Sequence, residues 1–158
     1  KGVASGLPLG VMVAKKNVMD WKQGAHGSTF GGNPLSCAAA LKTIDLIQNG
    51  LMQNAAIQGE YIMGHLRDLQ TRHPLMGDVR GKGLMIGVEF VKDSRKTKAK
   101  DESNAFVIEA FKRGLLLLPC GENSVRLSPS LTVNQDQCDV MLDIWEEALK
   151  AVEKQMKN

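Results

Sequence analysis

Two stretches near the start of the chain carry residue types that could do chemistry together. Lys1 opens the sequence and is followed by small residues, Gly-Val-Ala-Ser-Gly. Residues 26–34, His-Gly-Ser-Thr-Phe-Gly-Gly-Asn-Pro, combine two hydroxyl side chains with three glycines. Glycines let a backbone approach a ligand closely, and Ser28 and Thr29 add hydroxyl donors, so this stretch predicts a phosphate site. A reactive amine near a phosphate site indicates a cofactor that forms a Schiff base.

The phosphate site requires a helix to follow the loop. Asn33 is a suitable N-cap and Pro34 suits the first helical position, so we expect free backbone N–H groups and the positive end of the helix dipole to meet there. An ordinary helix-entry loop is the alternative, but a plain cap does not need three glycines as well. We expect His26 to orient the loop rather than to catalyse.

Strand and helix patterns around this loop predict part of a larger sheet domain. Residues 9–14 read as a short buried strand, and residues 33–48 read as an alanine-rich helix packed on both sides that ends at Asn49-Gly50. A single strand cannot satisfy its own edges, so this unit is a piece of an α/β domain. We expect residues 1–32 to make few contacts within this chain.

The rest of the chain predicts a small α+β domain. A helix over residues 51–72 ends at His73-Pro74, and we expect it to link the two parts, with His65 and His73 facing solvent. Alternating apolar residues predict a strand within 79–91. We expect a helix at 101–113 and short strands at 115–118 and 124–127. A capping box at Asn134 and Gln137 predicts the start of a last helix. This last helix carries one apolar stripe: Cys138, Met141, Leu142, Trp145, Leu149 and Val152.

Arg126 is the third candidate for chemistry. It lies in a predicted strand within a segment that has almost no other charge. Such an arginine is either salt-bridged or grips a carboxylate by two-point recognition, and we favour the second role. Arg80 is expected to have a structural role. The nearby glycines Gly81, Gly83 and Gly87 lack the dinucleotide-binding spacing, so this segment is not a Rossmann motif.

These stretches, together with Val-Arg-Leu-Ser-Pro at 125–129, resemble the class III pyridoxal-phosphate aminotransferases, the group that contains 4-aminobutyrate and ornithine aminotransferases. The resemblance runs from end to end of the chain and implies the C-terminal part of such an enzyme. It implies the end of a fold type I (aspartate-aminotransferase-like) PLP-binding large domain at residues 1–50, a linking helix at 51–73 and a small α+β domain at 74–158.

The resemblance also implies roles for individual residues. Lys1 would be catalytic and would carry pyridoxal 5'-phosphate covalently. Thr29, with Ser28, would contact the cofactor phosphate, characteristically across the interface of a homodimer or higher homo-oligomer. Arg126 would bind a substrate carboxylate. The expected reaction is transamination of an ω-amino acid such as 4-aminobutyrate, with 2-oxoglutarate as amino acceptor.

Two alternatives to this reaction remain open. A racemase of the same fold would use the same lysine, because removing and returning a proton on one carbon needs the same covalent adduct. The chain alone could instead be an inactive fragment or structural module. The family's aspartate for the pyridine nitrogen, its ring-stacking aromatic residue and its main phosphate loop all precede the lysine. We therefore expect these 158 residues alone not to transaminate.

Composition alone says little about which class of protein this is. With 158 residues, 43% apolar, and a formal charge of +3, the chain suits an ordinary globular protein, without a metal, nucleic-acid or membrane partner. No apolar run approaches the roughly 20 residues of a membrane span, and no leader opens the sequence. Cys37, Cys120 and Cys138 match no zinc motif and predict buried, reduced thiols in a cytoplasmic protein.

Five basic residues fall between positions 92 and 100 and raise the question of nucleic-acid binding. The stretch contains no aromatic residue on which a base could stack. We interpret it as a solvated loop between a strand and a helix.

Overall fold

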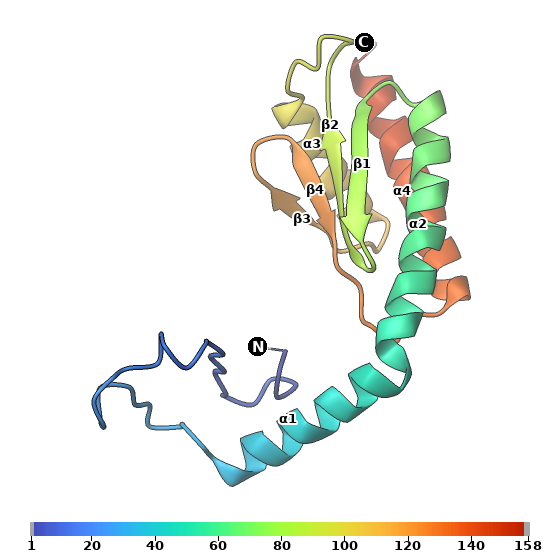
Figure 1. Ribbon diagram of the computed structural model, residues 1–158. Coiled ribbons are helices and arrows are strands. Elements are labelled where there is room, and N and C mark those ends of the chain that lie inside the picture. Colours follow the sequence, from blue (N-terminus) through green and yellow to red (C-terminus); the bar gives the residue numbers. More distant parts are fainter. Residues whose placement is uncertain (1, 157–158) are drawn as a thin grey trace. The chain divides into compact units, whose positions relative to one another are not determined.

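The computed structural model describes residues 2–156 and divides the chain into two compact units, Lys1–Leu51 and Met52–Asn158. The first unit consists of an extended segment and one helix. The second unit holds a four-stranded sheet with three helices (Figure 1). Its α/β content agrees with the fold class expected from the sequence.

The extended segment of the first unit forms no strand. Residues 9–14 were expected to be a buried strand, but they have no ladder partner, and Val11 and Val13 are 65% and 90% exposed. A strand needs a neighbour to pair its backbone groups, and the first unit offers none within the described residues. Between residues 2 and 33 only Ala4 is buried, so the expectation of few contacts there is confirmed.

The helix of the first unit, α1 (Pro34–Leu46), begins as its sequence predicts. The Asn33 side-chain oxygen accepts hydrogen bonds from the backbone N–H groups of Leu35 and Ser36, both at 3.1 Å. The expectation that α1 is packed on both sides is wrong within the described residues. Only Ser36 and Ala40 are buried, because no second layer covers its apolar side chains.

The turn η1 (Ile47–Leu51) follows α1 and ends its helical geometry. Asn49 and Gly50 leave helical dihedral angles, and Gly50 has a φ of 151°, which an L side chain rarely adopts. The predicted stop at Asn49-Gly50 is therefore confirmed.

The second unit is built on one antiparallel sheet whose strands lie in the order β1-β2-β4-β3. Its strands are β1 (Met76–Lys82), β2 (Met85–Phe90), β3 (Leu118–Cys120) and β4 (Ser124–Leu127). The single strand expected within 79–91 is in fact a hairpin. Gly83, at φ 54°, takes the first position of the two-residue turn between Lys82 and Met85. The strand expected at 115–118 lies instead at 118–120.

Three helices cover one face of this sheet: α2 (Met52–Arg72), α3 (Lys100–Lys112) and α4 (Gln135–Met156). In Figure 1, α2 runs beside β1, and α3 lies behind the strands. The core between helices and sheet centres on three aromatic rings. Phe106 lies 5.0 Å from Phe90 and 4.5 Å from Trp145, measured between ring centroids, and all three residues are fully buried.

The helix α4 follows its prediction in full. Asn134 and Gln137 exchange hydrogen bonds, the Asn134 side chain accepting from the Gln137 backbone at 2.9 Å and the Gln137 side chain accepting from the Asn134 backbone at 3.1 Å. Every member of the predicted apolar stripe is buried. The segment 92–98 is exposed, as expected of a solvated loop.

Two predictions about single side chains are wrong. His73 was expected to face solvent, but it is only 5% exposed, and its Nδ1 lies 2.8 Å from a carboxylate oxygen of Glu153 on α4. His65 is exposed, as predicted. All three thiols were expected to be buried, but Cys37 is only half-buried and Cys120 lies at the exposed end of the edge strand β3. Cys138 is buried among apolar groups, and this burial raises the pKa of its thiol.

Candidate functional site

Lys1, the predicted catalytic residue, lies outside the described residues. The first candidate site that the structure describes is therefore the loop expected to bind a phosphate. It spans residues 26–33 and consists of two consecutive turns. In the first, the backbone N–H of Gly31 donates to the carbonyl of Ser28 at 3.0 Å, and in the second the N–H of Asn33 donates to the carbonyl of Phe30 at 3.2 Å.

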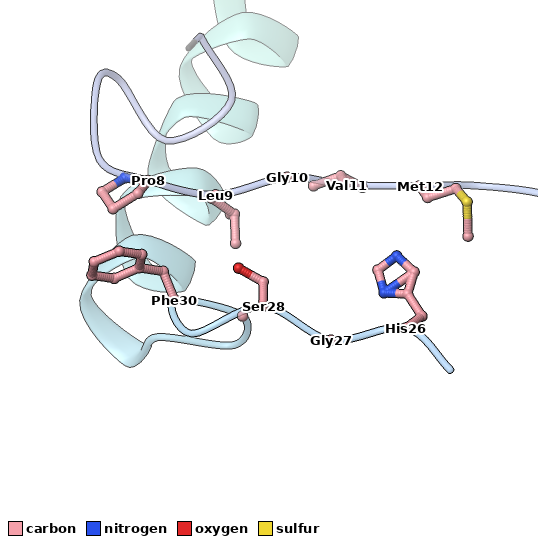
Figure 2. Close-up of a pocket in the computed structure, with 10 residues that line it drawn as sticks. Pro8, Leu9, Gly10, Val11, Met12, His26, Gly27, Ser28 and Phe30 are labelled. Atoms are coloured by element: carbon pink, nitrogen blue, oxygen red, sulfur yellow. The ribbon is translucent and has the colours of Figure 1, made fainter. Parts of the chain in front are cut away.

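The loop faces residues 8–12 across a hollow of about 690 Å³ (Figure 2). Figure 2 shows the Ser28 hydroxyl pointing from the loop toward Leu9, and the His26 ring on the same side. His26 also lies 5.1 Å from the Trp21 ring, measured between centroids. Thr29 is exposed and does not line this hollow, so the structure places only one of the two predicted hydroxyls in it.

The donors for a phosphate differ from those expected. Two N–H groups of the first turn of α1 are already bonded to the side chain of Asn33, so the helix end does not present them to a ligand. The hydroxyls of Ser28 and Thr29, in contrast, make no hydrogen bond to any residue in the described range 2–156, and both residues are exposed. Two unpaired hydroxyl donors on a glycine-rich loop suit phosphate oxygens.

The second candidate site lies on the sheet face that the helices leave uncovered. Arg126, on β4, projects from this face, since its neighbours Val125 and Leu127 point into the core. It lines a groove of about 640 Å³ together with Arg80, Gly87, Glu89 and other residues. The predicted location of Arg126 on a strand is confirmed.

Strand register places two arginines on either side of one glycine. Arg80 of β1 and Arg126 of β4 both stand opposite Gly87 of β2, one on each side. An added Cβ on Gly87 would meet no atom within 4 Å, so open space separates the two arginines on this face.

The two arginines differ in their ion pairs. Arg80 donates to Asp78 at 2.7 Å and to Glu89 at 3.1 Å, and hydrogen bonds to these carboxylates, Asp78 first, raise the pKa of Arg80. Arg126 has no ion-pair partner among residues 2–156. A further ion pair joins Lys98 and Glu122 at the edge of the groove, and hydrogen bonding to Lys98 lowers the pKa of Glu122.

Sequence reasoning missed Glu89 and Gly87 as parts of this groove. Both alternate with the buried residues of β2, so the period of two already placed them on the opposite face. The sequence does not show which strand pairs with β2, and only the pairing with β4 brings Gly87 and Glu89 beside Arg126.

Two other kinds of site find no support in the described part of the chain. Residues 2–156 contain no cluster of three or more histidine, cysteine or acidic side chains that could hold a metal ion. Over the same range, the helices are too short or too polar to cross a membrane.

Known proteins resemble this chain over almost all of its length. The family model for class III aminotransferases matches residues 1–149. Acetylornithine aminotransferase from Caldanaerobacter subterraneus subsp. tengcongensis is 33% identical over 96% of this chain and 37% of its own length. Isoleucine 2-epimerase from Lentilactobacillus buchneri is 39% identical over 97% of this chain and 35% of its own length. The chain therefore spans about a third of the length of these curated relatives.

Solved structures agree with the sequence comparisons. An amine transaminase from an uncultivated Pseudomonas species, in its PLP-bound (internal aldimine) form, superposes with a TM-score of 0.75 at 35% identity. The match covers 82% of this chain and 30% of the transaminase. The family match over residues 1–149, together with the curated relatives and the solved structures, leads to one conclusion: the chain belongs to the class III aminotransferases, a family of PLP-dependent enzymes.

Proposed function

We propose that the complete protein is a PLP-dependent enzyme that transfers amino groups between small molecules. The observation that carries this proposal is the family match, which begins at Lys1 and includes the serine and threonine of the loop and Arg126. In this proposal residues 1–50 end the PLP-binding large domain, residues 51–73 link it to the next part, and residues 74–158 form the small C-terminal domain.

The cofactor fits the groups that this chain supplies. Ser28 and Thr29 offer two exposed hydroxyls without partners in the described residues, and these would donate to the cofactor phosphate. The Lys1 amine would hold the cofactor aldehyde covalently. When bound, PLP supplies an electron sink that stabilises negative charge on the substrate carbon next to the amino group.

The chain's own residues would then perform two tasks. Lys1, once free of its covalent bond, would take a proton from the substrate carbon as a neutral amine and would then return a proton as the resulting ammonium group. Arg126 binds a carboxylate through two parallel N–H donors and so orients the substrate. The absence of a competing ion pair on Arg126 within residues 2–156 supports this role.

The substrates are proposed from the resemblance described above. We infer an ω-amino acid such as 4-aminobutyrate as donor and 2-oxoglutarate as acceptor. We also infer a cytoplasmic homodimer or higher homo-oligomer with the cofactor site at the subunit interface.

Amino-acid racemisation is a second candidate function. The relative described above as isoleucine 2-epimerase is 39% identical to this chain, against 33% for the acetylornithine aminotransferase. The same lysine would serve both reactions, since each begins by removing a proton from the substrate carbon.

Borohydride reduction of the complete protein with PLP, followed by peptide mass analysis, tests the assignment of Lys1. We expect a pyridoxyl adduct on Lys1 and its loss in Lys1→Ala, which should also lose the yellow colour of the complex. An adduct on a different lysine would contradict the proposal.

A second experiment separates the two reactions. One enantiomer of an amino acid is supplied without a keto acid, and the other enantiomer is sought by chiral chromatography. A racemase forms the other enantiomer without any acceptor, whereas a transaminase does not form it and instead converts the amino acid into its keto acid once a keto acid acceptor is added.

A further inference from the structure

We propose that Arg80 is a positioning residue that keeps Arg126 available to a carboxylate by holding Glu89 away from it. The inference rests on the proposed role of Arg126 as a carboxylate ligand. It concerns the uncovered face of the sheet in the second unit and the three strands β1, β2 and β4.

The register of these strands places Glu89 between the two arginines. Glu89 of β2 stands opposite Asp78 of β1 and opposite Ser124 of β4. Arg80 lies two residues after Asp78 on β1, and Arg126 lies two residues after Ser124 on β4. Both arginines are therefore diagonal neighbours of Glu89 on the same face. Diagonal neighbours in an antiparallel sheet are about 7–8 Å apart, a distance that long side chains can bridge.

Glu89 is therefore within reach of both arginines, and all three residues line the same groove. In the structure its carboxylate lies 3.1 Å from the Arg80 guanidinium and forms no ion pair with Arg126. A carboxylate of the protein on Arg126 would occupy the donors that a substrate carboxylate needs.

Charge explains why the removal of Arg80 would redirect Glu89. Arg80 is bonded to Asp78 and Glu89 together, so two carboxylates share one guanidinium. Without that guanidinium, Arg126, across Gly87, is the one arginine that still lines the groove among the described residues. No side chain on Gly87 would obstruct the new pair, since this residue has only open space above it. Glu89 would then compete with the ligand for Arg126.

The test measures binding of succinate, a dicarboxylate that cannot react, to the complete PLP-loaded protein by calorimetry. We expect Arg80→Gln to weaken succinate binding about three- to five-fold, the upper part of the range for an exposed ion pair acting as competitor. In Arg80→Gln/Glu89→Gln the competitor is gone, so binding should return to within about two-fold of wild type. In steady-state kinetics, Arg80→Gln should raise KM for the acceptor and leave kcat nearly unchanged.

Arg113→Gln is the matched control. Arg113 is paired with carboxylates as Arg80 is, but it lies at the end of α3 and does not line the groove. It should leave succinate binding unchanged. Glu89→Gln alone should bind succinate at least as tightly as wild type, and this variant tests the inference even if Arg80→Gln does not fold.

Three results would overturn the inference: unchanged binding in Arg80→Gln, a double variant that binds as weakly as Arg80→Gln, or weaker binding in Glu89→Gln. Arg126→Gln separates the inference from the proposed function. If Arg126→Gln loses succinate but the double variant shows no rescue, only the role of Arg80 is wrong. If Arg126→Gln binds as wild type, the carboxylate role of Arg126 fails, and the inference fails with it.

Discussion

Gly59 of α2 packs directly against Gly83, the turn residue of the β1–β2 hairpin. A Cβ atom added to Gly59 would lie 2.7 Å from the Gly83 Cα and closer still to its carbonyl group. Backbone atoms cannot move aside as the end of a flexible side chain can. The helix can therefore approach the hairpin this closely only because residue 59 has no side chain.

We expect Gly59→Ala to lower the free energy of unfolding by about 2–3 kcal/mol, because the methyl group forces helix and hairpin apart. Gly64→Ala is the matched control on the same helix. A Cβ there meets nothing within 4 Å, so alanine should stabilise the protein by about 0.5–1 kcal/mol through its helix propensity. Urea unfolding followed by circular dichroism measures both changes, and equal effects at the two glycines would contradict the packing argument.

Buried His73 gives a second prediction. Its imidazole donates to Glu153, whose other carboxylate oxygen is buried without a hydrogen-bond partner in the described residues. We expect His73→Ala to destabilise the fold by about 1–3 kcal/mol, because it removes a donor from a half-buried carboxylate. His65→Ala, at an exposed site on α2, should change the unfolding free energy by less than about 0.5 kcal/mol. Thermal and urea unfolding of both variants provide the comparison.

Elements specified by local signals could be predicted from the sequence. The capping box at Asn134 and the apolar stripe predicted α4 because both signals lie within the helix itself. The N-cap at Asn33 likewise predicted the start of α1. The break at Gly50 was predictable for the same reason, since its φ of 151° is a property of one residue.

Features that depend on distant partners could not be predicted. Residues 9–14 have the composition of a strand, but strand formation requires a neighbouring strand to pair with. The burial of His73 depends on Glu153, 80 positions later in the sequence. The hairpin was missed because the apolar alternation starts at Leu84 and covers only β2, whereas the apolar residues of β1 are only Met76 and Val79. For the candidate site, sequence predicted Arg126 but not its neighbours across the sheet.

Glu109 provides a prediction about pH. Its carboxylate accepts hydrogen bonds from Lys112 at 2.8 Å and from Arg113 at 2.6 Å, and these bonds, Lys112 first, hold the pKa of Glu109 below its ordinary value of 4.5. A carboxyl group whose pKa is lowered by folding stabilises the native state above its unfolded pKa, and this contribution is lost as pH falls through the folded pKa.

We therefore expect Glu109→Gln to be less stable than wild type near neutral pH, with the difference disappearing as pH falls below 4.5. Urea unfolding at a series of pH values measures this difference in the free energy of unfolding. Glu60→Gln, on the exposed surface of α2, is the control and should show no such difference. A constant difference between Glu109→Gln and wild type at all pH values would indicate a packing effect instead of an ionic one.

The hydroxyl of Thr29 is expected to contribute to cofactor affinity. Thr29→Val keeps the shape of the side chain and removes one donor, so PLP should dissociate about five- to ten-fold more readily from the complete protein, equivalent to about 1 kcal/mol. Thr71→Val, on the exposed end of α2, makes the same change away from the loop and should have no effect on PLP. Equilibrium dialysis of the cofactor measures this affinity without relying on activity, and equal affinities in the two variants would remove Thr29 from the site.

Larger side chains at position 87 test whether a carboxylate binds in the groove, because they would fill the space beside Arg126. Gly87 lies on a strand with open space above it, so valine, which favours strands, should be tolerated there with little change in stability. Its side chain would stand between Arg80 and Arg126 and obstruct a carboxylate that approaches Arg126.

We expect Gly87→Val to weaken succinate binding to the complete protein about ten-fold, and Gly87→Ala to have a smaller effect because its methyl group reaches less far into the space. Calorimetry measures the binding, and urea unfolding checks that the fold is retained. If Gly87→Val folds and binds succinate as the wild type does, the carboxylate does not enter the groove between these arginines. If the groove binds the carboxylate, the loss of succinate affinity must grow with side-chain size at position 87 while the unfolding midpoint stays the same. A general loss of stability would lower that midpoint as well.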